Sequence, residues 1–218
     1  MRGKRRDEQG RTMALDRQQV VAEAVALLDA EGLDGVTTRK LATRLGVRSP
    51  TLYWHVPNKA ALVTAIADAI LADLVGRMSP PTPDEPWQDW LTGLARELRR
   101  ALVAHPDGAR VISAAQLSAA MNAVSELAMS SLVAKGLPLP RARVVTLAVE
   151  RFTVGYVLEE QAPRPDETAL KNWDLAEFTA AHPTLIAGIT DYFQDGRTPD
   201  DLFDDCLRVV IAGAAAAA

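Results

Sequence analysis

The chain has 218 residues, 48% of them hydrophobic and 24% charged, which is ordinary for a soluble globular protein and long enough for a small domain fused to a larger one. No stretch approaches the roughly 18 consecutive apolar residues of a membrane span. Because no apolar run follows the basic N-terminus, we expect no secretory signal. The lone cysteine, Cys206, can form no intrachain disulfide, so we expect a cytoplasmic protein. The net charge of −4 argues against a protein that coats DNA. The charge is unevenly distributed, however: residues 1–59 carry 11 Lys/Arg and 7 Asp/Glu, whereas the remaining residues carry 13 Lys/Arg and 21 Asp/Glu. Such a distribution is expected when only one end of a protein meets a polyanion.

The N-terminal quarter predicts a short arm followed by a series of helices. Residues 1–12 are polar and lack apolar periodicity, so we expect a flexible arm. Asp16 is a good N-cap for a helix over 16–30, which Gly32 stops. Thr37 or Thr38 can cap a short second helix, which Gly46 terminates. Two further helices follow, one opened by Ser49 as N-cap with Pro50 behind it, the other capped by Asn58 and running over 59–77.

The rest of the chain also predicts helices and loops only. Four prolines within 79–86 indicate an extended connection. Helical periodicity then returns in segments separated by Gly and Pro breaks or by the proline-containing loop 162–172, namely 87–104, 107–113, 117–135, 141–161, 174–181, 183–194 and 200–217. No strand-like alternation and no internal repeat interrupts them. The predicted fold class is therefore all-α, with a three-helix helix-turn-helix domain at 13–60 and a larger helical domain at 61–218.

The most informative segment spans 37–62 and reads TTRKLATRLGVRSPTLYWHVPNKAAL. Two short helices around a glycine turn would pack through apolar residues of both, Leu41, Ala42, Leu45, Val47 and Leu52. The second helix begins with the small residues Ser49, Pro50 and Thr51. Such a slim N-terminus can enter a DNA major groove about 12 Å wide and present its tip to base edges.

Polar residues around this helix pair suit contact with DNA. Thr38 and Lys59 lie at predicted helix N-termini, where backbone N–H groups already favour a phosphate. Tyr53 and His55 add hydrogen-bond donors on the same short helix, and Arg39 has the long planar side chain that binds guanine through two hydrogen bonds.

An alternative stays open for each of these residues taken singly. Arg39, Lys40 and Arg44 are also compatible with a solvated helix face, and the pair Tyr53–Trp54 with a place in the core. The motif as a whole favours DNA binding.

This segment resembles the DNA-binding domain of the tetracycline-repressor (TetR) family, and the run SPTLYWHVPNKAAL is similar to the form found in the tetracycline repressors. Three further runs, WQDW at 87–90, HPDGA at 105–109 and GYVLEEQ at 155–161, resemble the C-terminal domain of that subgroup in the same order. The resemblance covers nearly the whole chain after the first dozen residues.

The resemblance implies a DNA-binding role for eight residues. Bases or backbone would be met by Arg39, Ser49, Pro50, Thr51 and Tyr53, and phosphates held by Thr38, His55 and Lys59. It also implies a homodimer that reads a palindrome with two heads about one helical turn apart. The dimer would be built from the helices at 141–161 and 200–217, with an apolar seam supplied by Val145, Ala148, Val149, Phe152, Leu202, Phe203, Leu207, Val210 and Ile211.

A ligand site in the larger domain is the second implication. Tetracycline repressors hold a magnesium–drug chelate with histidines and an asparagine, but the matching positions here are apolar, Val75, Leu94, Leu98 and Ile112. The histidines, His55, His105 and His182, do not cluster at metal spacing. We therefore reject tetracycline–magnesium, expect no cofactor or metal, and hypothesise a larger, more apolar organic inducer that contacts Leu94, Leu98, Ile112, Gln116, Leu117, Met121, Thr146 and Glu150.

Polar contacts to that ligand could come from one helix face. Arg143, Thr146 and Glu150 follow each other at i, i+3 and i+7. The same spacing is compatible with an exposed polar stripe, and Trp173 with Phe178 is compatible with a lid or with a cap on the core, so these alternatives stay open. Binding would shift the population towards a state in which helix 59–77 moves and the heads spread, with Pro57–Asn58 as the joint.

An enzyme is the main rival class, and the sequence disfavours it. No GxSxG, HExxH, Walker-type or GxGxxG pattern occurs. The aspartates at 200–205 suit the acidic first turns of a helix, and Cys206 suits a core position. Two alternatives remain, a small-molecule binding protein without specific DNA recognition and an activator of the same fold. The family association suggests control of an efflux pump or of a natural-product pathway.

Overall fold

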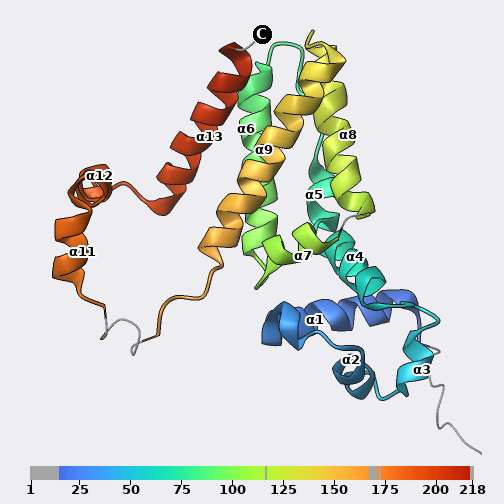
Figure 1. The fold of residues 1–218 in the computed structure, drawn as a ribbon. Helices are drawn as coiled ribbons and strands as arrows, with labels where there is room; N and C mark the ends of the chain where they lie inside the picture. Colours follow the sequence, from blue (N-terminus) through green and yellow to red (C-terminus); the bar gives the residue numbers. More distant parts are fainter. Residues whose placement is uncertain (1–14, 116, 167–170, 172, 217–218) are drawn as a thin grey trace, which may run out of the picture.

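A computed structural model describes residues 15–115, 117–166, 171 and 173–216 and confirms the all-α fold class. The described residues contain helices, turns and loops but no strand. Three helices, α1 to α3, form a head at one end, and a bundle of helices forms the body (Figure 1). Among the described helices, none taken singly has the length and apolar composition of a membrane span; only α7 and α8 together reach them, and this pair is bent by 86°. The predicted arm at 1–12 lies outside the described residues.

The head consists of α1 (Arg17–Gly35), α2 (Thr38–Arg44) and α3 (Ser49–Leu52). Local capping begins α1 and α2 as predicted, because Asp16 accepts a hydrogen bond from the Gln19 N–H and Thr37 accepts one from the Lys40 N–H. The predicted stop at Gly32 is instead a kink with φ of 69°, after which one further turn runs to Gly35. Glycine is required there, because a Cβ would lie 2.8 Å from the Asp107 carboxylate.

The predicted helix over 59–77 is broken into α4 (Lys59–Ile70) and α5 (Ala72–Arg77). Asn58 caps α4 by accepting a hydrogen bond from the Ala61 N–H at 2.8 Å, as predicted. α4 packs against α1 in the head and against α7 and α8 in the body. This helix is therefore one element through which a movement in the body can reach the head.

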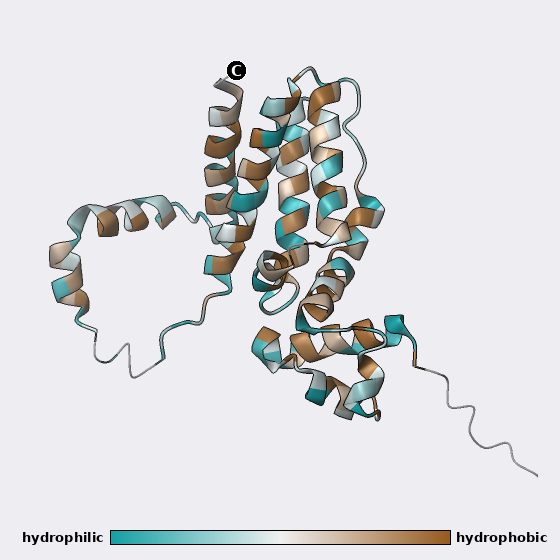
Figure 2. Cartoon of the chain, turned by 45° about the vertical axis from the view of Figure 1, so that its right-hand side comes forward, coloured by the Kyte–Doolittle hydropathy of each residue, from teal (hydrophilic) through white to brown (hydrophobic). Residues whose placement is uncertain are grey.

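The body is a bundle of α6 (Trp87–Val103), α8 (Ala119–Ala134), α9 (Leu139–Glu160) and α13 (Pro199–Ala216), with the short α7 (Gly108–Ala114) at the end nearest the head (Figure 1). Apolar and polar residues alternate around these helices, as Figure 2 shows, so each helix buries one stripe against its neighbours. One buried cluster joins the head, α4 and α7, and a second joins α6, α8, α9 and α13.

The packing of α13 corrects the predicted dimer seam. α13 lies against α6 and α9 of its own chain, and five of the nine predicted seam residues are buried there, Val145, Val149, Phe203, Leu207 and Ile211. They cannot contact a second copy, because their side chains are at most 4% exposed within one chain. The large apolar residues exposed on the two helices are Leu139 and Val144 on α9 and Val209 on α13.

The helices α11 (Leu175–Ala181) and α12 (Pro183–Phe193) lie beside the bundle and contain no buried residue (Figure 1). Tyr192 donates a hydrogen bond to Asp205 at 2.8 Å and so ties α12 to α13. The rings of Trp173, Phe178 and His182 pack on one another in sequence order. Since Trp173 is half exposed and Phe178 joins neither buried cluster, the interpretation of this pair as a cap on the chain's own core is wrong.

Candidate nucleic-acid interface and ligand cavity

The helix pair α2–α3 is held by a small apolar core and a glycine turn. Leu41, Ala42 and Leu52 are buried against α1. Gly46 has φ of 66°, and the Val47 N–H donates to the Ala42 carbonyl at 3.0 Å, which closes the end of α2. The turn directs α3 so that its N-terminus faces outward from the head.

Two details of α3 differ from the prediction. Ser49 is the first helical residue rather than the N-cap, and Arg48 occupies the cap without a side-chain hydrogen bond. α3 ends at Leu52, so Tyr53 and His55 lie in the turns after it rather than on it. The Leu52 carbonyl accepts hydrogen bonds from the N–H groups of both His55 and Val56, so one tight turn follows α3 and brings Val56 into the core.

The predicted DNA-binding residues gather on the outer surface of α2, α3 and the following turn. Five are exposed, Arg39, Pro50, Thr51, Tyr53 and Lys59, and three are half-buried, Thr38, Ser49 and His55. Tyr53 is 52% and Trp54 is 90% exposed, so the interpretation of these rings as core is wrong.

Two residues of this surface were missed by the sequence prediction. Trp54 and Arg48 are both exposed beside the residues named above. The only feature of the sequence that could have indicated the exposure of Trp54 is its position between Tyr53 and His55. That feature is weak, because a large aromatic residue is by default assigned to the core.

The cations of the head divide into two groups. Lys40 pairs with Glu31 and Arg44 pairs with Glu23, so these two are held on the head as the solvated-face interpretation expects. Arg39, Arg48 and Lys59 form no ion pair with other described residues. Their charge is therefore available to an external anion.

The head joins the body through a set of polar contacts around Asp107. This residue has φ of 59°, precedes α7, and accepts a hydrogen bond from the Leu33 N–H at 2.8 Å. Arg110 donates hydrogen bonds to both Asp107 and Asp34, and the bond to Asp34 lowers the pKa of the Asp34 carboxyl. His105 Nδ1 lies 2.7 Å from Asp29. The contacts fix how α1 sits on α7.

Four of the predicted ligand-binding residues line one interior cavity in the bundle. Leu94, Leu98, Thr146 and Glu150 surround it together with Leu91, Ala95, Val124, Ala128 and Val149. Its volume is about 10 Å³, at most the size of one water molecule. A drug-sized ligand needs roughly 300–1,000 Å³, so the helices are closed on each other here and have to separate before such a ligand can enter.

The other predicted ligand-binding residues are not brought to this cavity. Val75, Ile112 and Met121 pack in the cluster between head and body. Leu117 is 81% exposed and Arg143 is exposed, while Gln116 lies outside the described residues. Helical spacing places Arg143 and Glu150 on the same side of α9, two turns apart. The spacing does not determine whether a neighbouring helix covers the turn that carries Arg143.

Glu150 is the one ionisable residue of the cavity lining. Its Oε1 accepts a hydrogen bond from Ser125 Oγ at 2.7 Å. Burial raises the pKa of the Glu150 carboxyl, and neither the Ser125 hydrogen bond nor the nearby charge of Arg151 offsets that effect.

We predict that Glu150→Gln raises the stability of the fold at pH 7. A carboxyl group whose pKa is raised by folding stabilises the folded state at pH values below its ordinary pKa near 4.5. This contribution to stability is lost as the pH rises through the pKa of the folded state. The advantage of the glutamine variant is therefore expected to vanish on acidification towards pH 4. Urea unfolding between pH 4 and 8 measures it, with the exposed Glu126→Gln on α8 as control. A pH-independent difference would contradict the assignment.

Thr146 carries a buried hydroxyl without a partner. Its side chain is 1% exposed, and its Oγ1 has no hydrogen bond among the described residues. We expect Thr146→Val to raise the free energy of unfolding by about 1 kcal/mol, because an unsatisfied buried hydroxyl is replaced by a methyl group of the same shape. Thr153→Val is the matched control on the same helix and is expected to destabilise, since Thr153 Oγ1 donates to the Val149 carbonyl at 2.8 Å. Equal effects of the two substitutions in denaturant titrations would refute this account.

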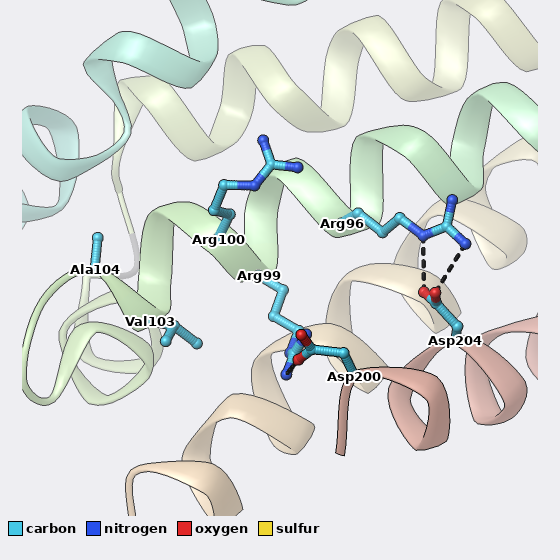
Figure 3. Close-up of a pocket in the computed structure, with 7 residues that line it drawn as sticks. All are labelled: Arg96, Arg99, Arg100, Val103, Ala104, Asp200 and Asp204. Carbon is cyan, nitrogen blue, oxygen red and sulfur yellow. Dashed lines mark hydrogen bonds and ion pairs between the residues drawn. The ribbon is translucent and has the colours of Figure 1, made fainter. Parts of the chain in front are cut away.

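A larger surface groove, of about 520 Å³, lies between α6 and α13 (Figure 3). Arg96 bonds Asp204 through two nitrogens at 2.7 and 2.9 Å. Arg99 bonds Glu160 at 2.9 Å and Asp200 at 2.7 Å, and its guanidinium lies 4.7 Å from the centre of the Phe203 ring. Since these charges neutralise each other, we interpret the groove as the attachment of α13 to the bundle rather than as a binding site.

Nothing in the described part of the chain resembles a metal centre, because no group of three or more His, Cys, Asp or Glu side chains is close enough to hold an ion. His55 is in the head, His105 contacts Asp29 and His182 lies at the end of α11.

Comparison with known proteins matches both parts of the chain. Residues 20–66 match the model of bacterial regulatory proteins of the tetR family, and residues 79–218 match that of the tetracyclin repressor-like C-terminal domain. The tetracycline repressor protein class A from transposon 1721 of Escherichia coli is 39% identical over 90% of this chain and 88% of the repressor.

Solved structures extend the comparison. TetR-Q116A from Acinetobacter baumannii AYE, in complex with minocycline, is 34% identical with a TM-score of 0.68, over 92% of this chain and 96% of that one. BioQ with its double-stranded DNA operator is 29% identical with a TM-score of 0.62, over 82% of this chain and 99% of that one.

Proposed function

From the premise that this chain belongs to the TetR family and is a DNA-binding transcriptional regulator rather than an enzyme, we propose that it is a cytoplasmic, homodimeric repressor of palindromic operator DNA. A small, largely apolar organic inducer releases it. We propose further that residues 13–60 form the DNA-binding domain and residues 61–218 the ligand-binding and dimerisation domain.

The observation that carries the DNA proposal is the outer surface of α2 and α3. It presents Arg39, Arg48 and Lys59 without ion-pair partners among the described residues, next to the exposed Tyr53 and Trp54. Arg39, which is exposed on α2, would read a guanine, and the small residues at the start of α3 would allow a close approach to base edges. Thr38, His55 and Lys59 would hold phosphates on either side.

Unpartnered apolar surface supports the homodimer. Val144 is 58% and Val209 is 73% exposed on adjacent helices of the bundle. α11 and α12 expose Leu175, Leu185 and Ile189 and bury none of their own residues. A second copy would cover such surface, and sedimentation measures the oligomeric state directly.

The inducer would bind where α6, α8 and α9 surround the cavity, after these helices separate. The positions proposed for contact are Leu94, Leu98, Thr146 and Glu150, with Val75, Ile112, Met121, Leu117, Gln116 and Arg143 as further candidates. Val75, Leu94, Leu98 and Ile112 offer no nitrogen or oxygen ligand, which supports an inducer other than tetracycline–magnesium.

Release would follow from a population shift. Opening the cavity displaces α6 and α8, and α8 and α7 both pack against α4. α4 in turn packs against α1, with Pro57–Asn58 at its start. The inducer changes DNA affinity only by its preference for the open state over the state that fits the operator.

A selection of random DNA duplexes on the purified protein, at two salt concentrations, tests the function. We expect enrichment of a palindrome with half-sites about one helical turn apart. If no sequence is enriched and binding is weak and strongly salt-dependent, only the electrostatic contribution remains. The chain would then be a small-molecule binding protein without specific DNA recognition. Whether the operator position makes the regulator a repressor or an activator is read from a reporter gene.

A further inference from the structure

A second groove on the body opens between α5 and α6 and has a volume of about 320 Å³, enough for a small organic ligand. Its charged lining is predominantly acidic, with Glu85, Asp89 and Glu97 against the single cation Arg77. Glu97 pairs with Arg77 at 3.6 Å and also with Arg100. Glu85 and Asp89 form no ion pair with other described residues, and the Glu85 carboxylate accepts a hydrogen bond from the Thr82 N–H. These two carboxylates are therefore the part of the lining that can attract positive charge.

Trp90 lines the same groove and is oriented by one hydrogen bond. Its Nε1 donates to the Ser79 carbonyl at 2.9 Å, and the residue as a whole is 9% exposed. The face of an indole ring attracts organic cations, so the groove combines an aromatic surface with unneutralised carboxylates.

Leu94 belongs to the lining of both this groove and the interior cavity, so the two spaces adjoin at this side chain. The cavity contains two polar residues in an otherwise apolar lining, Thr146 and Glu150. The Thr146 hydroxyl is buried without a partner, and the Glu150 carboxylate has one hydrogen bond, from Ser125. An uncharged ligand would leave an ionised carboxylate enclosed with it, whereas a cation would pair with that carboxylate in a medium of low polarity.

We propose that the inducer is an amphipathic organic cation, with an apolar body and a protonated amine, which enters through the acidic groove over Trp90, passes Leu94 and pairs with Glu150. This inference rests on the proposed function and specifies its ligand. The apolar body replaces contacts among Leu91, Leu94 and Leu98, and Thr146 accepts a hydrogen bond from the amine or from a neighbouring polar group.

Binding of matched probes to the full chain, followed by tryptophan fluorescence, tests the proposal without DNA. The probes are 2-(1-naphthyl)ethylamine and the larger cation rhodamine 6G, with the uncharged N-acetyl derivative of the amine and 2-naphthalenesulfonate as controls. We expect the amine to bind at least about tenfold more tightly than its N-acetyl derivative, as a hydrogen bond to a charged group implies. Glu150→Gln is expected to abolish that preference, and the exposed Glu126→Gln to retain it.

Equal binding of charged and uncharged probes, tighter binding of the sulfonate, or a preference unchanged in Glu150→Gln would each overturn the cation proposal. Circular dichroism verifies that both variants fold. If selection yields operator DNA, and neutral or anionic compounds release the protein from it whichever residue stands at position 150, the repressor proposal is supported and the cation proposal is refuted. Conversely, cation binding that depends on Glu150 in a chain that selects no DNA would support this site and refute the repressor.

Discussion

Phe203→Ala is expected to lower the free energy of unfolding by about 3–5 kcal/mol, the largest effect of any single substitution considered for this protein. Phe203 is 1% exposed in the cluster that joins α6, α9 and α13. Its ring lies 5.6 Å from that of Phe152 and 5.1 Å from that of Tyr156, measured between ring centres. Truncation removes these contacts together with that of the Arg99 guanidinium and leaves a cavity. Urea denaturation, monitored by circular dichroism, measures the loss.

Val209→Ala on the same helix is the control, because Val209 is 73% exposed. Its effect on the unfolding of one subunit is expected to stay within about 0.5 kcal/mol. The pair of variants also separates a core residue from a seam residue. If Phe203→Ala dissociated a dimer while the subunit kept its stability, Phe203 would belong to the interface between copies, as the sequence alone had suggested.

Arg39→Ala is expected to weaken binding to the selected operator by about 1–3 kcal/mol and to relax the preference at one base pair in each half-site. Arg39 lies exposed on α2 and has no ion pair with other described residues, so the loss reflects a missing contact to DNA rather than a disturbed head. Titration of the operator and of a duplex altered at that base pair measures both effects.

Lys40→Ala provides the comparison, since Lys40 is already paired with Glu31 on the head. It is expected to lower affinity slightly and equally for all sequences. Should Arg39→Ala bind operator and random DNA as the wild type does, the assignment of Arg39 to base recognition is wrong, and Arg48 would be the next cation to examine.

The features of the fold that could be predicted from the sequence are those set by neighbours along the chain. The caps at Asp16, Thr37 and Asn58 each depend on a hydrogen bond to a residue three positions later, so the local sequence suffices to locate them. The prediction failed for Ser49 because Arg48 and Ser49 can both precede the same helix turn, and the backbone of the following turns decided between them.

The candidate sites were predictable only in part. The helix-turn-helix residues follow one another within 22 positions, so their motif places them on one surface. The residues that line the interior cavity come from α6, α8 and α9, and the relative positions of these helices depend on packing. Arg143 illustrates the difference, because it satisfies helical spacing with Thr146 and Glu150 yet lies exposed.

What the sequence by itself determined is therefore the all-α class, the order of the helices and the DNA-reading motif. The tertiary structure decided that Phe203 and Leu207 face their own subunit, that Trp54 is exposed and that the cavity beside Glu150 is closed. The physical reason is that periodicity gives the angle of a side chain around its helix axis. Only contacts between helices far apart in the chain determine what covers that side chain.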